Sequence, residues 1–121
     1  MKVIYIAGPI SGKTPWDEEQ NIRKAEYIAL DVWKTGKAAV LCPHTNTRFF
    51  QYAIPYETLM EGDFEIISRC DAVLLIEGWE DSPGAVREER FALKLGIPVF
   101  YDIEDLKAWL GDPIIGGEKK T

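Results

Sequence analysis

The sequence predicts a doubly wound α/β fold, flavodoxin- or Rossmann-like, with one layer of four to five parallel strands between helices. Short apolar runs alternate along the chain with segments of helical periodicity. The runs are apolar throughout, which is typical of strands buried on both faces. We expect the first and third strands to lie side by side at the centre of the sheet. Ligands of such folds bind beyond the carboxyl ends of the strands.

Strong start and stop signals separate the predicted elements. The apolar runs assigned to strands cover residues 3–7, 38–42, 71–76 and 98–101. The segments assigned to helices cover residues 15–34, 55–68, 82–96 and 103–110. Thr14 is the expected N-cap of the first helix before Pro15, Gly36 follows its end, and Ser82 before Pro83 repeats the N-cap signal. Residues 43–53, rich in Thr, Asn and aromatic residues, are expected to form a loop.

Composition limits the domain organisation and the partners. The 121 residues and 13.7 kDa leave room for one domain, assigned to residues 1–110, followed by a flexible tail at 111–121. A net charge of −6 disfavours nucleic-acid polymers as partners. No apolar run approaches the roughly 18 residues of a membrane span, and Met1-Lys2 leads directly into a strand, so neither a membrane segment nor a secretory signal is expected.

The cysteines and the single histidine indicate the compartment and argue against a metal site. Cys42 and Cys70 lie in or beside apolar runs, as buried reduced thiols of a cytoplasmic protein would. One histidine, His44, cannot complete a Cys/His zinc set, and we expect it to be a solvated loop residue. No metal and no cofactor are therefore expected.

Two carboxylates, Asp63 and Glu88, fall on the apolar faces of their predicted helices. Their apolar neighbours are Tyr56, Leu59, Met60 and Ile67 around Asp63, and Ala85, Phe91, Ala92 and Leu95 around Glu88. An unpaired buried carboxylate is costly, and two of them beside one strand favour a site over partial burial against a backbone N–H or an arginine. The pair suits glycosyl chemistry, with one carboxylate as nucleophile and the other handling a proton. Aspartyl chemistry or metal binding would use the same pair.

Three segments together resemble the nucleoside 2-deoxyribosyltransferase-like superfamily, which includes 2′-deoxynucleoside 5′-monophosphate N-glycosidases and short phage and bacterial relatives. They are Tyr5-Ile6-Ala7-Gly8-Pro9, Asp63 with Asp71 eight residues later at a strand start, and Ser82-Pro83-Gly84-Ala85-Val86-Arg87-Glu88. Residues 91–99 also resemble the family's passage from helix to strand. The resemblance covers residues 2 to 101.

The resemblance implies a role for each matching residue. Glu88 matches the nucleophile that attacks C1′ of the sugar and forms a glycosyl ester. Asp63 matches the aspartate that contacts the base and protonates it as it leaves, and Tyr5 matches the tyrosine that orients the nucleophile. The expected substrate-binding residues are Gly8, Pro9, Ile10 and Ser11 of the loop shaping the sugar pocket, with Trp79, Ser82 and Gly84. Trp79 fits base stacking and core packing equally well.

Ser82 bears on the substrate. The nucleoside transferases usually carry an aspartate at this position, whereas the monophosphate glycosidases carry a serine that binds the 5′-phosphate. Ser82 at a helix start also suits a phosphate on physical grounds, because a hydroxyl, backbone N–H groups and the helix dipole meet there. The pattern favours a nucleotide over a nucleoside. An ordinary N-cap role for Ser82 fits either substrate, and Asp81 could still serve a sugar hydroxyl.

The predicted function is therefore cleavage of the N-glycosidic bond of a 2′-deoxynucleotide or nucleoside, with water or a second base resolving the intermediate. One alternative is a nucleotide-binding module without catalysis. Another is a P-loop NTPase using residues 7–14, which satisfy a loose phosphate-loop pattern, although Ile76-Glu77 stands where an aspartate would be expected. Relatives complete their pockets from a neighbouring subunit, so a homodimer or larger homo-oligomer is expected. Phe49, Phe50 and Tyr52 are the aromatic residues available for contact.

Overall fold

The computed structural model describes residues 1–111 and confirms the α/β class. Its four strands are β1 (Lys2–Ala7), β2 (Ala38–Leu41), β3 (Ala72–Leu75) and β4 (Val99–Phe100). All neighbouring pairs are parallel, in the order β2-β1-β3-β4, so the first and third strands are adjacent at the centre as predicted. The carboxyl ends of β1, β2 and β3 consequently meet at one edge of the sheet.

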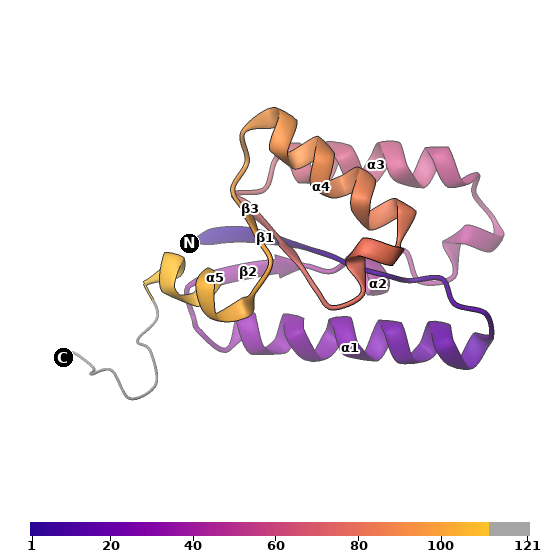
Figure 1. Ribbon diagram of the computed structural model, residues 1–121, viewed down its shortest axis with the longest axis horizontal. Helices are drawn as coiled ribbons and strands as arrows, with labels where there is room; N and C mark the ends of the chain where they lie inside the picture. Colours follow the sequence, from indigo (N-terminus) through magenta and orange to yellow (C-terminus); the bar gives the residue numbers. More distant parts are fainter. Residues whose placement is uncertain (112–121) are drawn as a thin grey trace.

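Helices cover both faces of the sheet (Figure 1). They are α1 (Pro15–Trp33), α2 (Pro43–Asn46), α3 (Tyr56–Ser68), α4 (Pro83–Leu95) and α5 (Ile103–Leu110), with short 3-10 turns η1 (Phe50–Tyr52) and η2 (Trp79–Asp81). Helices α3 and α4 lie on one face, and α1 and α5 lie on the other. The predicted caps are present: Thr14 Oγ1 accepts from the Asp17 N–H at 3.1 Å, and Ser82 Oγ accepts from the Ala85 N–H at 3.3 Å.

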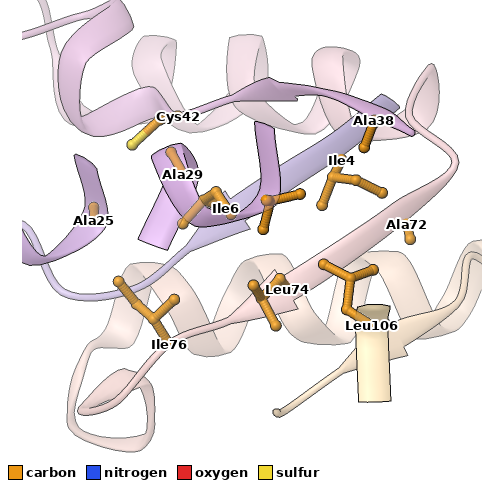
Figure 2. Packing of buried hydrophobic residues seen from close by; sticks show 11 residues of the cluster. Ile4, Ile6, Ala25, Ala29, Ala38, Cys42, Ala72, Leu74, Ile76 and Leu106 are labelled. Carbon is orange, nitrogen blue, oxygen red and sulfur yellow. The ribbon is translucent and has the colours of Figure 1, made fainter. Parts of the chain in front are cut away.

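Successive side chains of the central strands face opposite layers, as the pleat of a strand requires. Ile4 and Ile6 pack with α1 and α5, in a core cluster that Figure 2 shows from close by. Tyr5 and Ala7 point the other way and pack with α3 and α4. A tyrosine hydroxyl is thereby carried into the interior of the molecule, where it needs a hydrogen-bond partner.

Some local expectations were wrong. Residues 43–53 contain α2 and η1 rather than a plain loop, because Pro43 fits a first helical turn and the Thr45 and Thr47 hydroxyls donate to the carbonyls of Cys42 and Pro43. Two residues assigned to apolar faces are exposed, since Tyr56 is the first residue of α3 and Leu95 the last of α4.

The state of the cysteines agrees with the sequence. Both cysteines are free thiols, Cys42 buried and Cys70 half-buried. The expected tail falls outside the described residues apart from Gly111. Within residues 1–111, none of the helices is long and apolar enough to cross a membrane.

Candidate active site

The centre of the site is a buried hydrogen bond between strand β1 and helix α4. The Tyr5 hydroxyl donates to Glu88 Oε2 at 2.6 Å. Tyr5 is 0% exposed and Glu88 is 6% exposed, so little water competes for the contact. Glu88 reaches this position because it lies two turns into α4, on the face that packs against the sheet through Ala85 and Ala92. The helical-wheel position of Glu88 is thus buried, as the sequence predicted.

Asp63 brings a second carboxylate to the same place from helix α3. It is 9% exposed and lies close enough to Tyr5 and Glu88 for each group to alter the pKa of the others. Helices α3 and α4 are joined beside the site by Phe64 and Phe91, whose stacked rings have centroids 4.5 Å apart. Three elements distant in sequence therefore bring Tyr5, Asp63 and Glu88 together, beside an aromatic contact between two half-buried rings.

Burial dominates the protonation of the carboxylate pair. It raises the pKa of Glu88 to about 8 and that of Asp63 to about 6, while the Tyr5 hydroxyl lowers both by donating to the ionised forms. The negative charge of Asp63 raises the Glu88 value further. Because the groups interact, their titrations belong to the pair, which holds one proton near neutral pH. The pKa of Tyr5 is raised well above its usual range, so its hydroxyl stays a donor.

The loop after β1 lies at the meeting point of the strand ends. Gly8 is required by close packing, since a Cβ at this position would lie 2.4 Å from Ile76 Cγ1. Asn21 of α1 donates to the carbonyls of Ile10 and Ser11 at 3.2 and 3.3 Å. Pro9, in the same loop, is contacted by His44, which follows β2, and lies close to Gly78, which follows β3. The loop residues expected to bind substrate are therefore held in one conformation.

The first turn of α4 and the segment before it hold the remaining expected residues. Ser82 is half-buried at the N-cap, and Gly84 lies where a Cβ would be 3.3 Å from the Tyr56 hydroxyl. Trp79 is half-buried and packs on Tyr101, with ring centroids 5.6 Å apart. This contact shows Trp79 in a packing role. Ser82 and Gly84 precede Glu88 on the same helix, whereas Trp79 belongs to an aromatic cluster beside it.

Sequence reasoning missed or misjudged two polar residues. Asn21 follows no motif, and only its contacts reveal that it supports the loop. His44 was expected to be solvated but is 1% exposed, because α2 folds the chain against the end of β1. The sequence offered one signal that His44 could be buried: it follows Pro43, directly after a predicted strand. In the described residues 1–111, no three His, Cys, Asp or Glu side chains gather to hold a metal ion.

A groove on the opposite face was also not foreseen. It has a volume of about 490 Å³ and lies between α1 and the ends of β3 and β4, with Arg23, Lys24, Tyr27 and Tyr101 among its lining residues. It involves none of Tyr5, Asp63 and Glu88. The carboxylate pair and this groove are therefore on different sides of the sheet, and the groove adds nothing to the chemistry of the pair.

Comparison with known proteins places the chain in context. A solved structure described as a 2-desoxiribosyltransferase from Leishmania mexicana is similar to it, with a TM-score of 0.55 and 26% sequence identity over 82% of this chain. The match spans 62% of the length of that structure. A comparison with curated proteins finds no match. The family model described as a domain of unknown function, DUF4406, matches residues 2–101, and the chain belongs to this family.

Proposed function

We propose that this protein cleaves the N-glycosidic bond of a 2′-deoxynucleoside 5′-monophosphate or nucleoside through a covalent intermediate on Glu88. The observation that carries the proposal is the buried Tyr5–Glu88 hydrogen bond with Asp63 beside it. The similarity to a deoxyribosyltransferase supports nucleoside-processing glycosyl transfer at a general level. The roles of the three residues follow from their chemistry.

In the proposed reaction the ionised Glu88 carboxylate attacks C1′ of the sugar and forms an ester as the bond from C1′ to the base nitrogen breaks. Asp63 gives its proton to the departing base, and Tyr5 holds Glu88 by donating to Oε2. Water or a second base then attacks C1′ and releases the Glu88 carboxylate, while Asp63 regains a proton. The reactive form has the pair's one proton on Asp63. Because the pKa of Glu88 (about 8) exceeds that of Asp63 (about 6), this proton lies on Glu88 in the resting protein and passes to Asp63 before the attack, and the Tyr5 hydroxyl stabilises the negative charge then left on Glu88.

Two features favour a nucleotide as substrate. Within residues 1–111, the amides of residues 10–13 have no backbone hydrogen-bond acceptor, so they are available to an anion. Ser82 starts the helix that carries Glu88, where the Gly84 N–H, which has no backbone acceptor within residues 1–111, and the helix dipole favour a phosphate. We therefore assign the 5′-phosphate to the space between the β1 loop and the start of α4.

Thr14, the last residue of the loose phosphate-loop pattern, has another role in this structure. Thr14 caps α1 with its hydroxyl, and Pro15 follows it at the first helical position. A phosphate-loop NTPase instead needs its Ser or Thr hydroxyl for Mg²⁺. These contacts support the glycosidase over an NTPase.

The test is incubation with a panel of deoxynucleosides and their 5′-monophosphates, with free base as the readout. Glu88→Gln keeps the size of the side chain but removes the attacking charge, so turnover should fall by several orders of magnitude while ligand binding persists. Asp63→Asn should slow cleavage least for substrates with good leaving bases. Glu61→Gln, an exposed site on α3, is the matched control and should retain full activity.

Two outcomes would contradict the proposal. Near-normal cleavage by Glu88→Gln would exclude the covalent mechanism. If the wild-type protein binds a nucleotide in the panel but releases no base, the chain is a nucleotide-binding module without catalysis.

A homo-oligomer is also part of the proposal. Phe49, Phe50 and Tyr52 are exposed, and a second copy that packed on them would add its own residues to the proposed substrate site. The segment is held in place by Tyr52, whose hydroxyl donates to Glu18 at 3.1 Å, and by an ion pair between Arg48 and Glu19. Light scattering at high micromolar concentration should give a mass of at least two chains. A particle of 13.7 kDa would exclude it.

A further inference from the structure

The single histidine of the sequence is buried outside the catalytic set. His44 Nε2 lies 3.0 Å from the carbonyl oxygen of Pro9, and His44 Nδ1 lies 3.7 Å from Cys42 Sγ. The proposed reaction uses neither ring nitrogen. A buried imidazole with two polar partners needs a structural or functional reason.

The partners determine where the ring proton lies. A carbonyl oxygen can only accept, so Nε2 carries the hydrogen and donates to Pro9. Nδ1 is then an acceptor, and the Cys42 thiol donates to it. Burial lowers the pKa of His44 to about 4 and raises that of the Cys42 thiol, so near neutral pH the ring is uncharged and the thiol keeps its proton. The chain of donors from Cys42 through His44 to Pro9 is therefore self-consistent.

The loop that receives these contacts is held from several sides. His44 binds the carbonyl of Pro9, and Asn21 binds those of Ile10 and Ser11, so three successive carbonyls have fixed partners. Gly78 closes on Pro9 from the β3 side, where a Cβ would lie 3.2 Å from Pro9 Cγ. With its carbonyls fixed in this way, the loop presents its unpaired amides as a preformed surface rather than a mobile one.

We propose that His44 is a positioning residue, whose Nε2–H fixes the Pro9 carbonyl and, with Asn21, holds residues 8–13 in the shape that receives substrate. The inference rests on the proposed function, which assigns this loop to the sugar and phosphate. His44 touches no reacting atom in this scheme. It acts through the loop, so its loss should weaken substrate binding more than it slows the chemical step.

The first measurement needs no substrate and no variant. Because the protein has one histidine, ¹⁵N NMR of the ring reports His44 alone. We expect the neutral tautomer with the proton on Nε2 at pH 7. A neutral ring with its proton on Nδ1 would overturn the proposal, since Nε2 would then have no hydrogen to donate to Pro9.

The second measurement compares variants by hydrogen exchange and kinetics. His44→Met fills the space without a donor, and amide exchange at Ile76, whose N–H donates to the Ala7 carbonyl at the start of the loop, should accelerate about fivefold to tenfold, the equivalent of one net hydrogen bond. KM should rise by about the same factor, with kcat changed by less than about twofold. His44→Gln, which restores an N–H donor, should recover most of both effects. Cys70→Ala is the matched control, because it removes the other core thiol, which lies outside the chain of donors from Cys42 to Pro9.

The outcomes separate this inference from the proposed function. If Cys70→Ala raises KM as much as His44→Met, the effect comes from lost packing, and the positioning role is wrong. Unchanged exchange and KM in a folded His44→Met would also overturn it. If the wild-type protein cleaves nothing, the proposed function fails, and the exchange and NMR measurements still decide whether His44 holds the loop.

Discussion

Replacing Glu88 by glutamine should stabilise the fold, and the gain should grow with pH. Burial raises the Glu88 pKa from 4.5 to about 8, so the folded protein binds this proton more tightly than the unfolded chain. Stability is therefore lost as pH rises from 4.5 towards 8, where the unfolded chain ionises freely. Taken alone, the shift destabilises the fold by about 1 kcal/mol at pH 5 and about 3 kcal/mol at pH 7. Glu88→Gln should recover these amounts, because its amide is neutral and its oxygen still accepts from Tyr5.

The assay is urea unfolding of the wild type and Glu88→Gln at pH 5, 7 and 8, followed by circular dichroism. His44, whose pKa is lowered to about 4, adds an opposite slope between pH 4 and 6.5, but it cancels in the difference between the two proteins. Glu61→Gln makes the same charge change at an exposed position and should shift stability by no more than about 0.5 kcal/mol. If the gain of Glu88→Gln does not increase with pH, Glu88 titrates as an ordinary glutamate and the protonation argument fails.

Two further substitutions test the support of the site. Tyr5→Phe removes a buried hydrogen bond to a charged group, worth about 1.5–3 kcal/mol, so the acid limb of the pH–rate profile should move up by about one to two pH units; an unmoved limb would mean that Tyr5 does not stabilise ionised Glu88. Gly8→Ala would bring a methyl group to 2.4 Å from Ile76 Cγ1, and chemical denaturation should show a loss of about 1–3 kcal/mol; a loss below about 0.5 kcal/mol would mean that the end of β3 adjusts freely.

The fold was predictable because each local signal agreed with the others. Thr14 before Pro15 and Ser82 before Pro83 predicted the N-caps of α1 and α4, and both hydroxyls accept as expected. The uniformly apolar strands excluded a sheet with one wet face. The misjudged segment was 43–53, where hydroxyl and proline contacts within a few residues build short helices that periodicity cannot reveal.

The site was predictable in part. Asp63 and Glu88 were visible because a charge on an apolar helix face has few explanations, and both are buried. The link from Glu88 to Tyr5 spans 83 residues and could be expected only from the family resemblance. Contacts such as that of His44 with Pro9 depend on which strand ends meet, and this follows from strand order rather than from local composition. The catalytic roles stay a prediction.

The alternation along β1 and β3 divides the molecule by odd and even residue numbers. Even positions, such as Ile4 and Leu74, belong to the layer shared with α1 and α5, and odd positions, such as Tyr5 and Val73, belong to the layer of the carboxylates. Point substitutions in one layer can thus accumulate with little effect on the other. Inserting or deleting one residue within β1 would instead exchange the two sets and turn the tyrosine hydroxyl away from Glu88. The even positions of β1 can therefore change in composition with little effect on the site, whereas a change in the length of the strand before Tyr5 would displace its hydroxyl.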